Sequence, residues 1–258
     1  MQNINSLFFL TPIIVISISS ALMIYWYRKR HFRWTAIIFS LVAYAGAIAL
    51  KYAVQIPTID AVRNSGPVVL GVYYGVQTMF FEVGLAFLVV WIALRYHELS
   101  RKDGEGYASG LAFWENAGLI GIILLINYVT YYSILSSNTP LAQQLYEQLS
   151  TNAPALFASN QEALSLVGIA VFERISSIII HFAWGYLCFM AAYHRKPRLF
   201  LIALPMGLID FFVPFAAYSP IAFELLFFAL AVASLLVAWY VTKDLRRKQQ
   251  TEKPDTTI

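Results

Sequence analysis

The stretch AVFERISSIIIHFAWGYL, from Ala170 to Leu187, is strongly apolar, yet it contains Glu173, Arg174 and His181. Arg174 and His181 are seven residues apart, so both fall on one face of a helix, with Glu173 at the edge of that face. A carboxylate can act as a general base, while an imidazole or guanidinium can stabilise a developing negative charge. The stretch therefore has the residue types that acid–base chemistry requires.

Further acidic residues lie inside other apolar stretches, namely Glu82, Glu115 with Asn116 after it, and Asp210. At the helical rise per residue, the acidic residues and His181 fall roughly 12–30 Å from the basic ends of their segments. An unpaired charge in the middle of a membrane costs about 2.5–3.5 kcal/mol, so these groups are expected to converge in the interior of the protein.

The composition indicates that these stretches cross a membrane. The chain has 258 residues, of which 59% are hydrophobic and 12% charged, whereas soluble proteins average about 45–50% and 25%. We predict an all-α, polytopic transmembrane bundle of about seven helices, forming one domain over residues 1–245. The expected spans are approximately 7–27, 34–56, 68–96, 108–135, 164–193, 199–217 and 219–242.

The sixth expected span is the weakest, because it is short and contains Pro205 and Pro214. Proline removes a backbone hydrogen bond from a helix, so this segment is expected to be broken or tilted. A bundle of six helices remains an alternative.

Most of the 18 lysines and arginines follow the first, third, fifth and seventh segments. The positive-inside rule then places the N-terminus outside and the C-terminus in the cytoplasm. Lys51 is assigned to an apolar end near the outer side. Residues 246–258 are expected to form a disordered cytoplasmic tail. This distribution argues against a nucleic-acid partner and favours a plasma membrane of prokaryotic type.

The loop from Ser136 to Gln161 is the longest on the expected outer side and has no basic residue. Its LAQQLYEQL stretch places Leu141, Leu145 and Leu149 on one face, which predicts a short amphipathic helix that caps the bundle. Glu224, near the outer end of the last segment, is expected to reach interfacial water and is not assigned to the site.

FERISSIIIHFAWGYL resembles the E-R-x-x-x-x-x-x-H helix of the YhfC-type membrane peptidases, relatives of the PrsW and CAAX-prenyl protease group of glutamic intramembrane proteases. Glu173, Arg174 and His181 match this motif. MFFEVGLAF, KDGEGYASGLAFWENAG and GLIDFF are similar to the other family motifs, in the same order. The chain departs from the family pattern at Val83, Ala86, Phe113 and Met206.

The resemblance implies hydrolysis of a peptide bond within or near the bilayer, with lipid around the protein and a single-helix membrane protein as substrate. Glu82 or Glu115 would activate water as the general base. His181 and Asn116 would stabilise the oxyanion, and Glu173, Arg174 and Asp210 would orient these groups.

No cofactor is expected. One interior histidine with scattered carboxylates is a small set for zinc, which usually takes two or three histidine or cysteine ligands. Assistance by a metal ion that prefers carboxylate ligands is left open.

A non-catalytic function is the alternative. A buried polar cluster is also typical of transporters, proton relays and small-ligand receptors, and the Glu173–Arg174 pair could serve packing alone. The departures from the family motifs favour a further option, a pseudo-peptidase that binds a partner helix. A retinal protein is disfavoured because the seventh segment has no lysine before Lys243.

Overall fold

The computed structural model describes residues 3–137 and 139–245, and within these ranges the chain forms helices and no strand. Seven helical stretches are long and apolar enough to cross a membrane, which confirms the predicted fold class: Ser6–Arg30, Trp34–Arg63, Pro67–Arg95, Arg101–Leu135, Asn160–Tyr193, Pro197–Phe215 and Pro220–Val241. The predicted tail, residues 246–258, lies outside the described residues.

Four spans consist mainly of one continuous α-helix: α1 (Leu10–Arg30), α2 (Trp34–Arg63), α8 (Asn160–Tyr193) and α10 (Pro220–Val241). Two spans contain a π-helical segment between two α-helices. In the third span, Thr78–Val83 joins α3 (Pro67–Gln77) to α4 (Gly84–Arg95). In the fourth, Trp114–Gly121 joins α5 (Gly104–Phe113) to α6 (Ile122–Leu135).

The sixth span changes from α9 (Pro197–Ala203) into a 3₁₀-helix over Leu204–Phe215. Pro205 and Pro214 both lie in the 3₁₀ stretch, as expected if proline disrupts the α-helical ladder. The predicted break is therefore present. Gly207 lets this stretch approach the third span closely, since a Cβ atom there would lie 2.6 Å from the Cα atom of Met79.

The core of the bundle lies around α8, which packs against α10, α5, α4 and α1. α5 is buried from Gly104 to Ala112. The largest enclosed side chains include Trp184 and Phe189 of α8 and Tyr107 of α5. Because α5 leads directly into the π-helical segment that carries Glu115, this packing fixes where that carboxylate lies.

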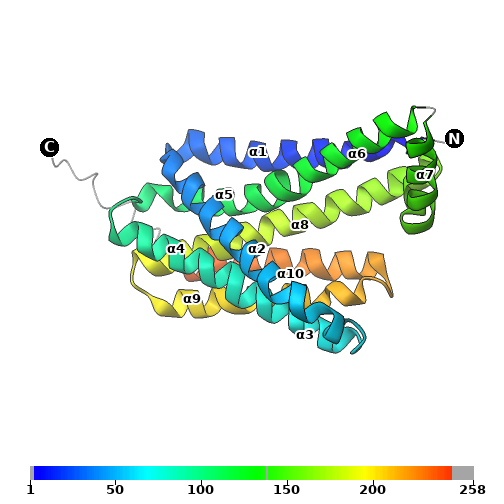
Figure 1. Ribbon diagram of the computed structural model, residues 1–258. Helices are drawn as coiled ribbons and strands as arrows, with labels where there is room; N and C mark the ends of the chain where they lie inside the picture. The colour runs from blue at the N-terminus through cyan, green and yellow to red at the C-terminus, as the bar shows by residue number, and fades with distance from the viewer. Residues whose placement is uncertain (1–2, 138, 246–258) are drawn as a thin grey trace.

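The predicted amphipathic helix is present as α7 (Pro140–Asn152), which lies across one end of the bundle (Figure 1). Leu149 is buried with Leu135 and Ile4, and Leu145 packs against this group. Leu141 is 57% exposed, so one of the three predicted contact residues faces outward. We call this side of the molecule the α7 end.

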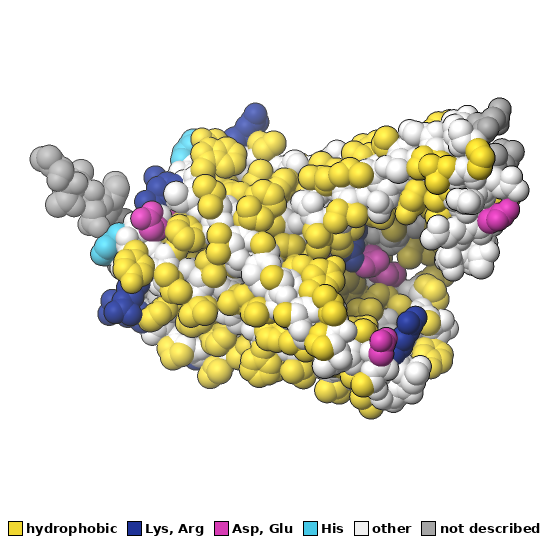
Figure 2. All heavy atoms as spheres, in the orientation of Figure 1, with side chains coloured by type: hydrophobic (Ala, Val, Ile, Leu, Met, Phe, Trp, Pro, Cys, Tyr) yellow, Lys and Arg dark blue, Asp and Glu magenta, His cyan; other side chains and the backbone are white. Residues whose placement is uncertain are grey.

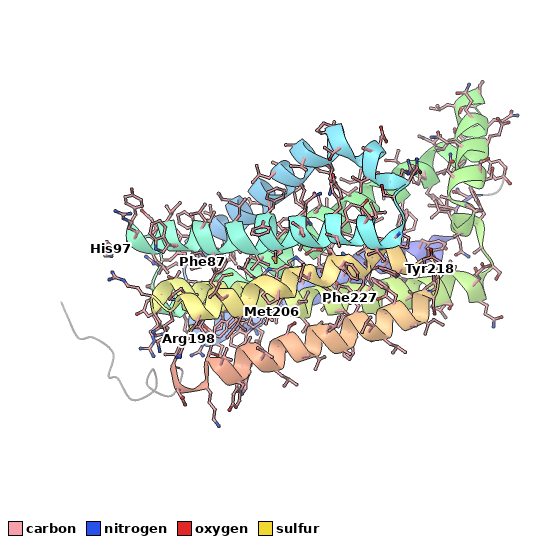
Figure 3. All side chains as sticks on the ribbon, turned by 90° about the horizontal axis from the view of Figure 1, so that it is seen from below. Phe87, His97, Arg198, Met206, Tyr218 and Phe227 are labelled. Carbon is pink, nitrogen blue, oxygen red and sulfur yellow. The ribbon has the colours of Figure 1, made fainter. Side chains whose placement is uncertain are left out.

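The opposite side, the basic end, carries the turn at His97 and the start of α9 at Arg198, whereas Tyr218 lies toward the α7 end (Figure 3). Asp103 connects the start of α5 to the start of α2, because it accepts hydrogen bonds from the backbone and guanidinium of Arg33 at 2.7–3.1 Å. Arg30 pairs with Glu105 at 2.6 Å. That the basic end faces the cytoplasm stays a prediction.

Candidate functional site

Three predicted site residues meet in the interior of the bundle. Glu82 Oε2 lies 3.1 Å from His181 Nε2, and Glu115 Oε2 also lies against this nitrogen. One ligand-type atom from each of the three side chains lies within 4.8 Å of the other two. The third, fourth and fifth spans therefore contribute to one cluster, as predicted from the cost of isolated charges.

The imidazole of His181 is fixed in orientation. Its Nδ1 lies 2.9 Å from the backbone carbonyl oxygen of Ser177, which can only accept a hydrogen bond. Nδ1 therefore carries a hydrogen and Nε2 is directed at the carboxylates. The ring lies between Trp184 and Tyr44, with centroid distances of 4.1 and 6.5 Å.

Lys51 is a site residue that the sequence reasoning missed. Its ammonium group bonds to Glu82 Oε1 and lies 3.4 Å from Asp210 Oδ2. Lys51 had been assigned to a helix end near residue 56, but α2 continues to Arg63, which places the lysine twelve residues before its end. That assignment is wrong because the polar residues after Ile56 continue the helix.

Asp210 enters the cluster through Lys51 and through Thr78, whose hydroxyl donates to Asp210 Oδ2. Thr78 begins the π-helical segment that also carries Glu82. The close backbone contact at Gly207 brings Asp210 to this position. The sixth span thus contributes to the site, as expected.

Arg174 links the cluster to Glu173. Its guanidinium bonds to the carboxylate of Glu173, and its Nη1 lies 3.6 Å from Glu115 Oε1. Among the described residues, Nη1 has no hydrogen-bond partner although it is buried. Arg174 therefore keeps a donor directed toward the cluster.

Asn116 is fully buried, and its side-chain nitrogen donates to the carbonyl oxygen of Ala112 at 3.0 Å. Its Oδ1 is buried without a partner among the described residues. This hydrogen bond engages the amide nitrogen within its own helix. The predicted role of Asn116 in stabilising an oxyanion is not tested by the geometry and stays a prediction.

Both π-helical segments carry cluster residues, Glu82 in Thr78–Val83 and Glu115 in Trp114–Gly121. A π-helical turn inserts an extra residue and shifts the face on which the following side chains lie; such turns occur frequently at functional sites. Because both π-helical segments carry a carboxylate of the cluster, they support the assignment of this part of the bundle as the candidate site.

The cluster is buried but not closed. The side chains of Glu82 and His181 are 9% and 6% exposed, whereas those of Glu173 and Asp210 are 35% and 31% exposed. Figure 2 shows a hollow between α6 and α3, in which acidic and basic side chains are visible. The edge of the cluster is therefore accessible, whereas its centre is enclosed.

Negative charge exceeds positive charge in this layer. The cluster holds four carboxylates, those of Glu82, Glu115, Glu173 and Asp210, against the two fixed cations Lys51 and Arg174. With a neutral His181, two negative charges are left over, so the centre can accept a proton or a divalent cation.

Glu224 was expected to reach interfacial water. The structure instead buries it, with 7% of its surface exposed, and its Oε2 has no hydrogen-bond partner among the described residues. The expectation failed because Glu224 faces α8 rather than the surface, and helix rotation cannot be deduced from distance to the helix end. Glu224 is not a member of the Glu82–Glu115–His181 group, and its charged neighbours are Glu173 and Arg174.

No curated protein and no solved structure matches the chain significantly. The family model described as YhfC intramembrane metalloprotease matches residues 12–223, which include every residue of the cluster. The chain is an integral membrane protein that belongs to the YhfC intramembrane metalloprotease family.

Proposed function

We propose that the protein is an intramembrane peptidase that hydrolyses a peptide bond within or near the bilayer. The observation that carries the proposal is the convergence of Glu82, Glu115 and His181 within 4.8 Å in the interior of a family member. A purely structural pair would not require carboxylates from four spans, because two groups suffice to neutralise a buried charge.

The family description implies a metal ion, and the donor set fits one. Each of the three residues directs one atom at the centre and has its other atom near a supporting group: Glu82 Oε1 on Lys51, Glu115 Oε1 near Arg174, and His181 Nδ1 on Ser177. Supporting contacts of this kind orient metal ligands. The convergence of two carboxylate oxygens on one imidazole nitrogen and the excess negative charge suit a divalent cation. Such an ion supplies Lewis acidity when bound.

Glu115 is the best candidate for the general base. Both oxygens of Glu82 are engaged, by Lys51 and His181. Glu115 Oε2 is directed at His181 and the centre, whereas Glu115 Oε1 lies 3.6 Å from Arg174, so Oε1 is the oxygen that can accept a proton. The side chain of Glu115 is also more exposed than that of Glu82, 16% against 9%. Glu115 takes a proton from water as the water oxygen bonds to the scissile carbonyl carbon. The C–N bond then breaks, and the proton passes to the departing amine nitrogen.

Arg174 is the best candidate for stabilising the oxyanion. Its buried Nη1 has a free donor among the described contacts and lies beside the proposed base. A donor that is already in place when negative charge develops needs little reorganisation, which is the basis of oxyanion stabilisation. Glu173 holds the guanidinium through its other nitrogen.

The test uses purified full-length protein in liposomes with a library of single-span helical substrates, and mass spectrometry to detect new termini. The wild type is expected to cleave a subset of substrates. Glu115→Gln is expected to lower the rate by about 100-fold or more, because it removes the general base. Glu147→Gln, on the exposed surface of α7, is the matched control and should leave cleavage unchanged.

Metal dependence is measured on the same samples. Elemental analysis should find a divalent metal in the wild type and less of it in Glu82→Gln, and a chelator should stop cleavage. Cleavage by Glu115→Gln at the wild-type rate would refute the proposed base. Substrate binding without cleavage by the wild type would identify a pseudo-peptidase instead.

A further inference from the structure

A groove separates the halves of α8 and α10 that lie toward the α7 end. It is a cavity of about 280 Å³, lined by Ser165, Gly168, Ile169 and Phe172 of α8 and by Ile221, Glu224 and Leu225 of α10. On each helix these positions follow the spacing of one face. Gly168 leaves room in the groove, since a Cβ atom there would meet nothing within 4 Å.

Glu224 is the one carboxylate that lines the groove. It is 7% exposed, and its Oε2 has no hydrogen-bond partner among residues 3–137 and 139–245. It lies beyond the first turn of α10, so it does not cap the free backbone N–H groups of the helix. A buried carboxylate oxygen without a donor is costly, which points to a donor supplied by a bound molecule.

The position and size of the groove restrict its occupant. Glu224 is four residues after Pro220, roughly 6 Å along the helix, which places it near the membrane surface. Tyr218, at this end of α10 in Figure 3, fits such a depth, because tyrosine is enriched at membrane interfaces. A helix is about 10–12 Å wide, so a cavity of this volume does not hold a helical segment.

We propose that this groove binds a membrane lipid whose headgroup carries a primary ammonium, such as phosphatidylethanolamine. The ammonium donates a hydrogen bond to Glu224 Oε2, and the exposed hydroxyl of Ser165 contacts the polar part of the headgroup. Ile169, Phe172 and Leu225 provide the apolar wall along which an acyl chain lies. This lipid site shares no residue with the Glu82–Glu115–His181 group, although Glu224 lies close enough to Glu173 and Arg174 to interact with them electrostatically.

Native mass spectrometry of the full-length protein in detergent tests the proposal. The probes are phosphatidylethanolamine, phosphatidylcholine and phosphatidylglycerol with identical acyl chains. Phosphatidylcholine keeps the positive charge but has no N–H donor, so it distinguishes hydrogen bonding from charge. We expect phosphatidylethanolamine to bind roughly tenfold more tightly than either, and this preference to disappear in Glu224→Gln, because a charged hydrogen bond is lost.

Two further variants keep the result interpretable. Gly168→Leu fills the groove without changing Glu224 and should also remove the preference, while Glu162→Gln alters an exposed carboxylate at the same end of α8 and should preserve it. Equal binding of the three lipids by the wild type would overturn the proposal. So would an unchanged preference in both Glu224→Gln and Gly168→Leu.

Discussion

Lys51 joins carboxylates from two other spans, Glu82 of the third and Asp210 of the sixth. Glu82 in turn faces His181, whose second neighbour is Glu115. The positions of these five side chains therefore depend on partners from other helices. Single substitutions that remove a charge should disturb stability and geometry together.

Lys51→Met should be strongly destabilising, by about 3–5 kcal/mol, because it leaves Glu82 and Asp210 without their cation. The thermal unfolding temperature in detergent measures this effect. Lys29→Met, at an exposed position of α1, is the control and should change the unfolding temperature little. Equal unfolding temperatures for the two variants would show that Lys51 does not neutralise the cluster.

Arg174 can be tested by comparing a single with a double substitution. Arg174→Met leaves Glu173 unpaired, so it should destabilise the protein more than Glu173→Leu combined with Arg174→Met. The double variant is expected to fold but to lose peptidase activity, because the guanidinium is absent. Full activity in a folded double variant would assign the pair to packing alone.

At the scale of the elements, the irregular helices position the site. The 3₁₀ stretch Leu204–Phe215 contacts the third span where its π-helical segment lies. Gly207 is a close contact point, because its backbone leaves no room for a side chain against Met79. This contact brings Asp210 to Thr78, whose hydroxyl donates to it.

Gly207→Ala should therefore destabilise the protein by about 1–3 kcal/mol, as overpacking does in a closely packed core. The atoms that a Cβ would meet belong to backbone, which cannot rotate away. Gly168→Ala provides the matched control, since its Cβ would enter open space. Thermal unfolding compares the two, and similar unfolding temperatures would mean that the sixth span can shift without cost.

The sequence predicted the seven spans, because each is a long apolar run, and the break in the sixth span, because proline has a known local effect. It also predicted that Glu82, Glu115, Glu173, His181 and Asp210 would lie in one interior region. Lys51 was missed, because the end of α2 was placed too early. The π-helical segments could not be predicted, because they depend on which carbonyl oxygen each backbone N–H bonds to. The burial of Glu224 could not be predicted either, because it depends on the rotation of α10 about its axis, which hydrophobicity does not determine.

At the scale of the whole molecule, charge is distributed unevenly along the bundle axis. Lysine and arginine gather at one end, whereas α7 covers the other (Figures 1 and 2). The positive-inside rule predicts that the basic end faces the cytoplasm. Cys188 is the one cysteine of the chain and is fully buried, so it should give little background in thiol labelling.

Cysteines introduced singly at Arg30, Arg101 and Lys196 should be protected from an impermeant thiol reagent added to intact cells, and should react after the membrane is opened. A cysteine at Gln143 of α7 should react in intact cells, because it lies at the opposite end. Labelling of any two of the first three positions from outside would reverse the proposed orientation.

The ion pair between Lys51 and Glu82 also constrains how the protein is assembled in the membrane. Lys51 is synthesised before Glu82, and during that interval its charge has no partner, which disfavours insertion of α2 alone. α2 and α3 are joined by only Asn64–Gly66, so they can enter together as a helical hairpin. Arg174 has its partner Glu173 beside it on the same helix, so its charge does not have to wait for the insertion of another span. The second and third spans should therefore leave the insertion machinery as a pair, whereas α8 can partition into lipid alone.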